Sequence, residues 1–301
     1  MTATHIAQES GGERVVFADG EPCLRPPSRP PAGALAACAS VISPGTELRR
    51  LRNSVHGEPQ PAGYMNITSG PVTGELLLVP APHGAWVQPN HPRALTVPAG
   101  TSLALLAAAR FQLIAALGLS HDTFTTPSTA LVAGSGPVAL GCCLELLRRG
   151  TENLTLLTDR SDVPFARDLG AQPTRSVPAG SARVVIDVTG RIEPGLAAVA
   201  PGGTFGLLGT PDPDSVVSTL HVHRQSVAII GMHELSGYDH DTYQRQYSAV
   251  LAWLTSAFGG DLPDRWCDRL CEDQLVDYYR HLAEGGPGRG TRPITIVEWA
   301  R

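Results

Sequence analysis

The chain has 301 residues, of which 42% are hydrophobic and 17% are charged, and its formal net charge is −5. This composition predicts a folded protein of two ordinary domains or one large one, and it excludes a disordered chain. The acidic balance and the absence of a basic stripe argue against nucleic acid or an anionic membrane as a partner. No apolar run approaches the length of a membrane helix.

The lysine and cysteine contents of the chain limit which catalytic mechanisms and metal sites it can have. The chain contains no lysine, so all 23 of its basic residues are arginines, which excludes Schiff-base catalysis and a lysine general base. Its six cysteines are scattered and form no CxxC pair, which argues against a disulfide framework or a zinc lobe. With an N-terminus unlike a signal peptide, they predict a cytoplasmic protein, and the lysine-free, arginine-rich composition is typical of a GC-rich bacterial gene.

Residues 1–118 alternate short apolar runs with turn signals, which predicts a β-rich domain. Within this domain Pro44-Gly45 marks a turn, and Thr46 stands where the N-cap of a short charged helix is expected. Glu47 would begin that helix, and its carboxylate is expected to pair with a neighbouring arginine. A longer apolar helix is predicted from about residue 102 to residue 117.

From Ser128 onward, predicted strands alternate with predicted helices, which indicates a parallel sheet built from βαβ units. The strands are expected in TALVAG, NLTLLTD, SARVVIDVTG, TFGLLGT and SVAIIGM. The helices are expected in PVALGCCLELLRRG, in VPFARDLG, in IEPGLAAVAPGG (a helix followed by a turn) and at about 241–258. HVHRQ (221–225) is expected to be a strand with both histidines on one face, but no third metal ligand lies nearby. The tail adds a helix at about 272–283 and a closing strand in TRPITIVEW.

The stretch AGSGPVALG follows the first of these strands and opens a helix, and it reads G-x-G-x-x-A. Gly134 permits a tight turn, Gly136 lets the backbone approach a pyrophosphate, and the small Ala139 lets the helix pack close to the strand. The phosphates would lie on the free N–H groups of the helix N-terminus. The predicted phosphate contacts are Gly134, Ser135, Gly136, Pro137 and Val138.

Asp159 ends the second strand, close to the position where an acidic residue meets the adenosine ribose of a dinucleotide. Its carboxylate would repel a 2′-phosphate, which favours NAD(H), while the adjacent Arg160 leaves NADP(H) as the alternative. Two further segments at the carboxyl edge of the sheet are expected to line the cofactor through their backbone: Val188, Thr189, Gly190, and Leu208, Gly209, Thr210.

These motifs make the chain resemble the medium-chain dehydrogenase/reductase superfamily over nearly its whole length. The resemblance rests on AGSGPVALG, Asp159, VIDVTG and PGGTFGLLG, and on SVISPGTEL, PAGYMNITSG and PHGAWVQPNHPRALTVPAG. It implies an α/β protein with a GroES-like β-rich substrate domain and a Rossmann domain with a doubly wound parallel sheet. The domains would comprise residues 1–118, 119–258 and, as a return to the substrate domain, 259–301. The resemblance also implies a homodimer, an active site in the interdomain cleft, and an NAD(P)(H)-dependent oxidoreductase acting on a small molecule.

The chain departs from the zinc alcohol dehydrogenases of this superfamily at the metal positions. Aligned on the family, Ser43 takes the place of the ligand cysteine, Tyr64 that of the histidine and Met65 that of the glutamate. None of the three is a good zinc ligand, so no metal is expected. The SPGTE motif with GY in place of GH resembles the zinc-free branches, which act on specialised metabolites and pigments.

Without zinc, another group must stabilise the negative charge that develops on the substrate oxygen during hydride transfer. Tyr64 is the candidate proton donor, Thr46 and Ser43 could relay the proton, and His83 could act as acid or base. In the family layout, His233 and Glu234 would contact the substrate. Each has a structural alternative: a packed Tyr64, a capping Thr46, a His83 in a surface loop, and unpartnered loop residues at 233 and 234.

The preferred function is a zinc-independent alcohol/ketone oxidoreductase of specialised metabolism. Three alternatives remain open at this stage. The chain could be an enoyl or quinone reductase of C=C bonds, a redox-neutral enzyme with permanently bound NAD, or a homologue that binds the cofactor without catalysis.

Overall fold

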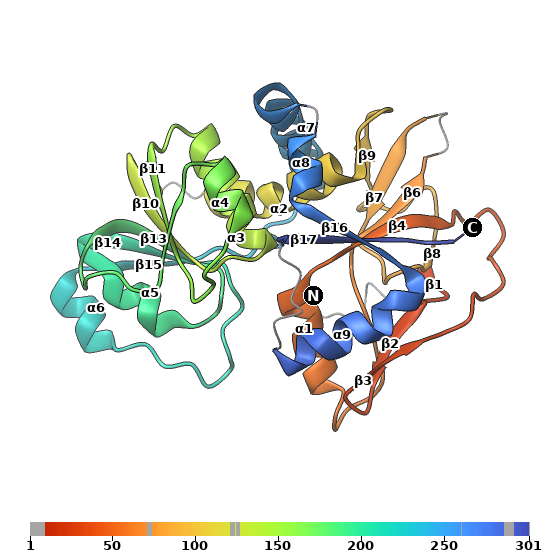
Figure 1. Ribbon diagram of the computed structural model, residues 1–301, viewed down its shortest axis with the longest axis horizontal. Coiled ribbons are helices and arrows are strands. Elements are labelled where there is room, and N and C mark those ends of the chain that lie inside the picture. The colour runs from red at the N-terminus through yellow and green to blue at the C-terminus, as the bar shows by residue number, and fades with distance from the viewer. Residues whose placement is uncertain are drawn as a thin grey trace. The chain divides into compact units, whose positions relative to one another are not determined.

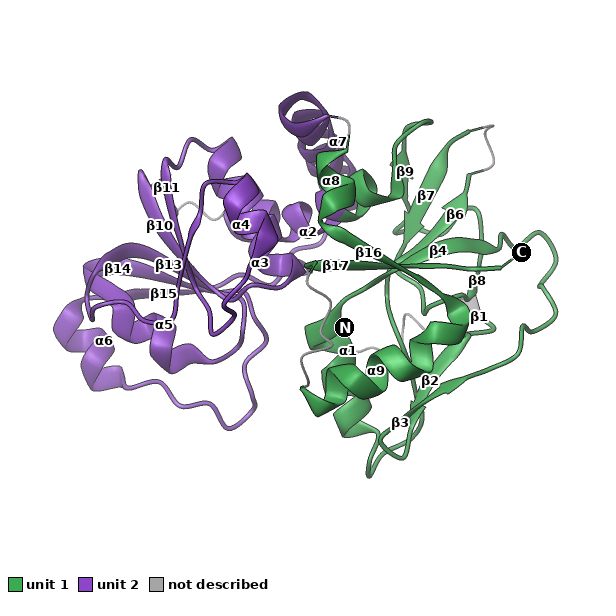
Figure 2. Ribbon diagram, viewed as in Figure 1, with its two compact units in different colours: residues 1–107, 261–301 green, residues 108–260 purple. Residues whose placement is uncertain are grey.

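The computed structural model describes residues 10–70, 74–120, 124, 127–259, 261–285 and 292–300. The chain divides into two compact units, with unit 1 formed by residues 1–107 and 261–301 and unit 2 by residues 108–260 (Figures 1 and 2). Unit 1 is rich in antiparallel strands and unit 2 holds a parallel sheet, so the predicted α/β class is confirmed. The divisions follow residues 107 and 260, whereas the predicted domain boundaries followed residues 118 and 258.

Unit 1 contains short strands, mostly from the first hundred residues, and helices from both ends of the chain. Its strands are β1 (Ser10–Gly11), β2 (Val15–Ala18), β3 (Glu21–Leu24), β4 (Ala37–Ile42), β5 (Gln60–Pro61), β6 (Asn66–Ser69), β7 (Leu76–Val79), β8 (Trp86–Val87), β9 (Leu95–Val97), β16 (Cys267–Cys271) and β17 (Ile294–Glu298). Its helices are α1 (Pro44–Asn53), α8 (Leu262–Arg265), the 3₁₀-helix η2 (Glu272–Gln274) and α9 (Leu275–Glu284).

The largest sheet of unit 1 has the strand order β16-β17-β4-β6-β7-β9. The closing strand β17 pairs antiparallel with β4, where Thr295 lies opposite Ile42, and parallel with β16. Strands β4 and β17 are buried along most of their length, which agrees with their nearly unbroken apolar sequences. The tail predicted to return to the first domain therefore supplies an interior strand of its sheet.

A buried polar network supports the turn that follows β7. The Asn66 side chain donates to the carbonyls of Pro82 (2.6 Å) and Ala85 (3.3 Å) and accepts from the Gly84 N–H (3.2 Å). The Ser40 hydroxyl also donates to Asn66. Because Asn66 is fully buried and satisfied on both its oxygen and its nitrogen, it holds residues 82–85 in one conformation.

Unit 2 alternates strands and helices along the chain. Its elements are β10 (Thr129–Ala133), α3 (Pro137–Arg148), β11 (Asn153–Leu157), α4 (Pro164–Asp168), β12 (Gln172–Thr174), β13 (Ala182–Asp187), α5 (Ile192–Ala198), β14 (Val199–Leu207), α6 (Thr219–Gln225), β15 (Ala228–Gly231) and α7 (His240–Phe258), and helix α2 (Leu103–Gly118) enters it from unit 1.

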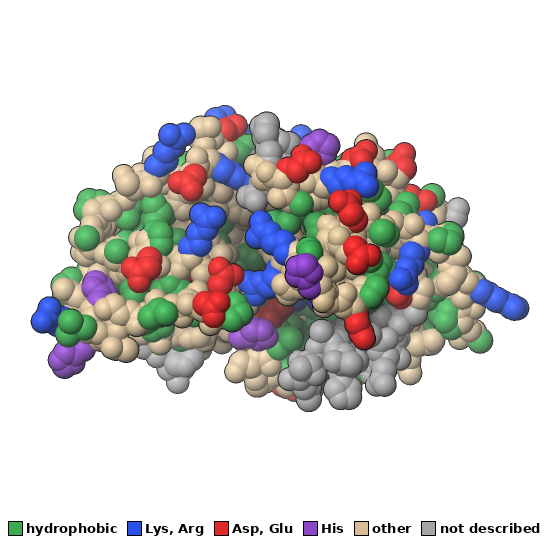
Figure 3. Space-filling model, turned by 90° about the horizontal axis from the view of Figure 1, so that it is seen from below, with side chains coloured by type: hydrophobic (Ala, Val, Ile, Leu, Met, Phe, Trp, Pro, Cys, Tyr) green, Lys and Arg blue, Asp and Glu red, His purple; other side chains and the backbone are tan. Residues whose placement is uncertain are grey.

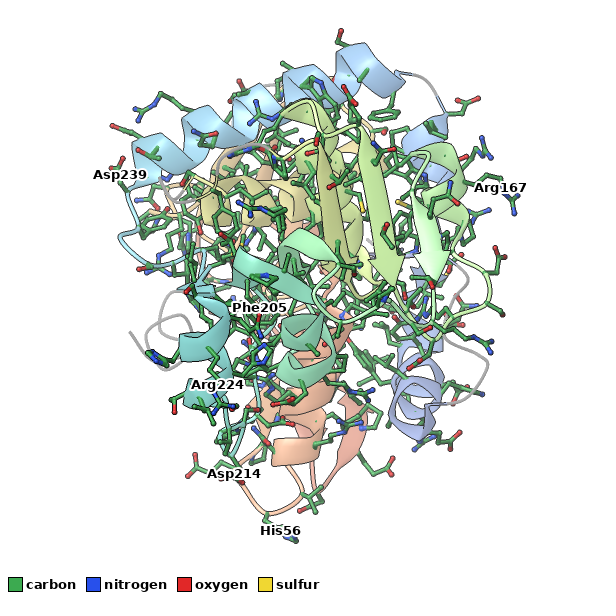
Figure 4. All side chains as sticks on the ribbon, turned by 90° about the vertical axis from the view of Figure 1, so that its left-hand side faces the viewer. His56, Arg167, Phe205, Asp214, Arg224 and Asp239 are labelled. Atoms are coloured by element: carbon green, nitrogen blue, oxygen red, sulfur yellow. The ribbon has the colours of Figure 1, made fainter. Side chains whose placement is uncertain are left out.

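The sheet of unit 2 is parallel throughout, with the order β12-β11-β10-β13-β14-β15. The strand order reverses direction between β10 and β13, and right-handed crossovers then place α3 and α5 on opposite faces. Phe205 of β14 is fully buried in the side-chain packing of this unit, whereas Asp214 and Arg224 lie at its surface (Figure 4). The topology is that of a doubly wound dinucleotide-binding fold.

Several elements differ from those predicted. The HVHRQ segment is wrong as a strand, because it lies in helix α6, whose N-cap residue Ser218 accepts from the His221 N–H (3.2 Å). Strands β12 and β16 and helix α8 were not predicted, since each is short and lacks a clear apolar period. In the described part of the chain, no helix combines the length and apolar character that crossing a membrane requires.

The Asn66 network yields a stability prediction. Replacing Asn66 by Ala leaves the Gly84 N–H and the Ser40 hydroxyl without their buried acceptor, so we expect a loss of about 2–3 kcal/mol in the free energy of unfolding. Denaturant titration followed by fluorescence measures this loss. Asn53→Ala, the same change at an exposed position, serves as the control and should alter stability by less than about 0.5 kcal/mol. Equal stability of the two variants would contradict the assignment.

Candidate functional site

The SPGTE motif forms the beginning of helix α1. The helix begins at Pro44, and Ser43 is its N-cap residue, so the predicted cap at Thr46 and the predicted start at Glu47 are wrong. Proline suits the first helical turn, where a backbone N–H would have no intrahelical partner. The Ser43 N–H donates to Glu47 Oε1 at 2.8 Å, which leaves the Ser43 hydroxyl available for other contacts.

Three of the predicted catalytic side chains meet at this helix end. The Tyr64 hydroxyl donates to Ser43 Oγ at 3.0 Å, and the Ser43 hydroxyl lies 3.5 Å from Thr46 Oγ1. Tyr64 is partly buried, Ser43 is buried and Thr46 is exposed. The three hydroxyls therefore form a chain from a half-buried phenol to the surface of unit 1.

Glu47 is fully buried and is connected to this hydroxyl chain through Ser43, whose N–H donates to Glu47 Oε1. Its partners are not arginines, as predicted, but His83 and Tyr279: His83 Nε2 is 3.1 Å from Glu47 Oε2, and the Tyr279 hydroxyl donates to the same oxygen. Burial, followed by the neighbouring Glu47 charge, raises the pKa of Tyr279 well above its ordinary value. The phenol of Tyr279 therefore stays protonated and acts as a hydrogen-bond donor.

His83 is fully buried, so its interpretation as a surface-loop histidine is wrong. Its backbone N–H donates to the Ala62 carbonyl at 2.9 Å, and its ring packs directly on the backbone of Gly63. A Cβ at Gly63, whose φ is +81°, would lie 2.4 Å from His83 Nδ1. Nδ1 has no hydrogen-bond partner, which leaves Glu47 as the polar contact of this ring.

Arg50, about one turn after Glu47 in helix α1, binds the segment that precedes Tyr64. Its guanidinium donates to the carbonyls of Pro61 (3.1 Å) and Gly63 (2.9 Å). Tyr64 is thus tied to helix α1 through both its own hydroxyl and the backbone just before it. Arg50 has no local sequence signal for this role, since its contacts lie more than ten residues away along the chain.

In unit 2 the predicted phosphate contacts form a turn between β10 and α3. Gly134 has a φ of +130°, and a Cβ there would lie 2.5 Å from Val188 Cγ2, so only glycine fits this turn. Gly136 is the N-cap residue of α3, and a Cβ there would meet no protein atom within 4 Å. The open space beside Gly136 and the helix N-terminus fit a dinucleotide pyrophosphate. Pro137 begins the helix and Ala139 is buried against the sheet, as the motif requires.

The loop after β11 is tied to this turn. The Thr158 hydroxyl donates to Ser135 Oγ at 2.9 Å, and the Arg160 N–H donates to Thr158 Oγ1 at 3.2 Å. Asp159, between them, is exposed, so its carboxylate is accessible to a ligand. Thr158 was not identified from the sequence, although its place directly before Asp159 was a usable signal.

The loops after β13 and β14 lie against each other. The buried Asp187 carboxylate accepts from the N–H groups of Thr189 (3.0 Å) and Gly190 (2.9 Å), and burial raises the pKa of Asp187 against the opposing effect of these bonds. Gly190 has a φ of +75°, and a Cβ there would lie 2.3 Å from the Thr210 carbonyl oxygen. A Cβ at Gly209 would lie 2.5 Å from the Gly190 nitrogen. The two predicted backbone segments, 188–190 and 208–210, are therefore in contact with each other at the carboxyl edge of the sheet.

The two predicted substrate contacts after β15 differ in their surroundings. Glu234 forms a bidentate ion pair with Arg110 of α2, at 2.8 and 2.9 Å, and its carbonyl accepts from the Tyr243 hydroxyl at 2.8 Å. The interpretation of Glu234 as an unpartnered loop residue is therefore wrong, and both carboxylate oxygens are already occupied. His233 is exposed, and its Nδ1 accepts from the Leu235 N–H.

Within the residues that the structure describes, no group of three or more His, Cys, Asp and Glu side chains could hold a metal ion. On the face shown in Figure 3, acidic side chains and arginines are intermingled. This intermingling agrees with the composition, which indicated no extended basic surface.

Comparisons with known proteins agree with this geometry. No protein-family model matches the chain. The chain is 30% identical over 166 residues to D-altritol 5-dehydrogenase from Agrobacterium fabrum, a match that covers 51% of this chain but only 47% of that protein. The match therefore spans about half the length of that relative.

Solved structures match over nearly the whole chain. Galactitol-1-phosphate dehydrogenase from Escherichia coli has a TM-score of 0.72 and 13% identity, covering 95% of this chain and 99% of its own. Acetophenone reductase from Geotrichum candidum, in complex with NAD, has a TM-score of 0.73 and 14% identity, covering 96% and 97%. Glucose dehydrogenase from Haloferax mediterranei, in complex with NADP, Zn and gluconolactone, has a TM-score of 0.62 and 15% identity, covering 96% and 99%. The chain therefore has the fold of the medium-chain dehydrogenases.

The Arg110–Glu234 pair yields a prediction that separates a structural role from a substrate contact. Glu234→Gln removes the negative charge that Glu234 places beside a mostly buried guanidinium, so we expect a loss of about 2–3 kcal/mol in the free energy of unfolding and a Tm lower by roughly 5–10 °C. Thermal unfolding followed by circular dichroism measures the shift, with the exposed Glu152→Gln as the matched control. A variant that keeps its Tm but loses affinity for substrate would instead make Glu234 a substrate ligand.

Proposed function

We propose that this protein is an NAD(P)(H)-dependent oxidoreductase of the medium-chain dehydrogenase type that interconverts an alcohol and a ketone. The observation that carries the proposal is the turn at Gly134–Gly136, where open space faces the N-terminus of helix α3 at the switch point of a doubly wound sheet. The partial match to D-altritol 5-dehydrogenase and the NAD or NADP bound by structural neighbours support the same activity.

NAD(H) is the proposed cofactor in preference to NADP(H). Asp159 is exposed two residues after the end of β11, where its carboxylate can accept hydrogen bonds from ribose hydroxyls and would repel a 2′-phosphate. Arg160 is the feature that favours NADP(H). The contacting backbone segments 188–190 and 208–210 would bind the remainder of the dinucleotide. When bound, the dinucleotide supplies the hydride chemistry of the reaction.

Tyr64 is the proposed partner of the substrate oxygen. In ketone reduction, its phenol would donate a hydrogen bond to the oxygen as negative charge develops and would then transfer its proton. The Ser43 and Thr46 hydroxyls would replace that proton from solvent, because each hydroxyl can both donate and accept. In alcohol oxidation the same chain would carry the proton outward.

We further propose that the reaction proceeds without zinc. At the family's metal positions this chain has two hydroxyl residues, Ser43 and Tyr64, hydrogen-bonded to each other, and the thioether of the buried Met65. Zinc sites in proteins use thiolate, imidazole or carboxylate ligands, so this set suits hydroxyl chemistry better than metal chemistry. The similarity of the SPGTE and GY motifs to zinc-free branches supports a specialised small metabolite as substrate. The lysine-free composition and the scattered cysteines support a bacterial, cytoplasmic protein, and the resemblance to the superfamily supports a homodimer.

Gly136 provides a test of cofactor binding. Gly136→Ala should weaken NADH binding at least about tenfold, since the added methyl occupies the place of the pyrophosphate, while the Tm stays within about 2 °C. Gly134→Ala is the matched comparison and should lower the Tm, because its methyl would clash with Val188. Isothermal titration and thermal unfolding measure the two effects. If the wild-type protein binds neither NADH nor NADPH, the proposed function is wrong.

Tyr64→Phe tests the catalytic assignment. Loss of the phenol should lower kcat by about 100-fold or more, as expected for removal of a general acid, and should leave NADH affinity unchanged. Absorbance of NADH during turnover of an alcohol and ketone panel measures kcat, and Tyr278→Phe serves as the control for loss of a tyrosine hydroxyl in the same unit. Full turnover by Tyr64→Phe would remove Tyr64 from the mechanism. Reduction of C=C bonds by the wild type would identify an enoyl or quinone reductase instead.

A further inference from the structure

We infer that Glu47, His83 and Tyr279, here called the buried triad, are positioning residues that hold the Tyr64 and Ser43 hydroxyls in place for catalysis. This inference rests on the proposed function, because it assigns a role relative to the proposed catalytic Tyr64. None of the three side chains reaches the surface: each is 0% exposed. They therefore act through the residues that they contact.

The burial of the triad points to a role beyond packing. A carboxylate, an imidazole and a phenol in one core are costly to desolvate, and apolar side chains of similar volume would stabilise the core as well or better. The surroundings are apolar: Tyr279 belongs to the core of unit 1, and its ring packs edge-to-face on Phe17 at 5.0 Å between centroids. The Glu47 carboxylate, the Tyr279 hydroxyl and His83 Nε2 are thus directed at one another and at the helix end.

The first connection from the triad leads to Ser43. One oxygen of Glu47, Oε2, is held by Tyr279 and His83, and the other, Oε1, accepts from the Ser43 N–H at 2.8 Å. Because the carboxylate is planar and both of its oxygens are engaged, its orientation determines where the Ser43 backbone lies. The Ser43 hydroxyl is the acceptor for Tyr64 at 3.0 Å.

The second connection leads to Tyr64. His83 contacts Glu47 Oε2 through its Nε2 at 3.1 Å, which leaves the other ring nitrogen, Nδ1, without a hydrogen-bond partner. The Nδ1 side of the ring lies against Gly63, the residue immediately before Tyr64, in a contact too close for any Cβ. The buried triad therefore constrains both members of the Tyr64–Ser43 pair, each from a different side.

A double-mutant cycle tests this role. Glu47→Gln should lower kcat about 10- to 100-fold through misplacement of the phenol, with NADH affinity unchanged. In a Tyr64→Phe background the same substitution should lower kcat by less than about threefold, because no phenol remains to be positioned. If the two effects multiply instead, Glu47 does not act through Tyr64 and the inference is wrong. All rates are measured well below the Tm of each variant.

Tyr279→Phe tests the triad with a smaller change, in case Glu47→Gln does not fold. Its phenyl ring can keep the packing against Phe17, while Glu47 loses one donor. We expect a fall in kcat of about 3- to 10-fold that also disappears in the Tyr64→Phe background. The adjacent Tyr278→Phe removes a hydroxyl 3.3 Å from Thr295 Oγ1 and should leave kcat unchanged. Equal effects of the two tyrosine variants would contradict the inference.

Hydrogen exchange provides a measurement that needs no turnover. In Tyr279→Phe the amides of residues 40–48 should exchange at least about fivefold faster than in the wild type and in Tyr278→Phe, because the anchor of the Ser43 N–H is loosened. Unchanged exchange would overturn the inference even if the protein proved catalytically silent. If the protein binds no dinucleotide, the proposed function is wrong. Faster exchange in Tyr279→Phe would in that case still demonstrate that the triad holds Ser43 in place.

Discussion

The buried Glu47 carboxylate is the constraint on which the candidate site depends. A buried carboxyl group is tolerated only when its oxygens are hydrogen-bonded, and here they contact the Ser43 N–H, His83 and Tyr279. Tyr279 lies 232 residues from Glu47 in the sequence, on a helix contributed by the end of the chain. The carboxylate is therefore satisfied only after the two ends of the chain have come together, which couples the assembly of unit 1 to the shape of the site.

Much of unit 2 could be predicted because its signals are local. The turn glycines 134 and 136, the helix beginning at Pro137 and the strand ending before Asp159 lie within one βαβ segment, where spacing and residue type determine the backbone. The strand predicted at HVHRQ failed because helix α6 has no buried residue and so no apolar period. Its capping residue, Ser218, was a local signal that could have corrected the assignment.

Unit 1 was less predictable because its decisive contacts are distant in the sequence. The start of helix α1 was misplaced by three residues, although Pro44 is the usual first residue of a helix and Ser43 a usual cap. The partners of Glu47 at positions 83 and 279, and the contacts of Arg50 with the 61–63 segment, follow no periodic pattern. Such contacts arise from the antiparallel sheet and the returning tail, which only the folded chain brings together.

The two units use different chemical means for their proposed tasks. The Gly134–Gly136 turn would bind a dinucleotide through its backbone. The proposed proton donor, by contrast, is a side chain whose placement must be accurate to a fraction of an ångström. A metal ion would impose such accuracy through its coordination geometry. In a hydroxyl-based site the accuracy has to come from the protein interior. A buried carboxylate with both oxygens hydrogen-bonded, one of them to the backbone of Ser43, is a physical means of providing it.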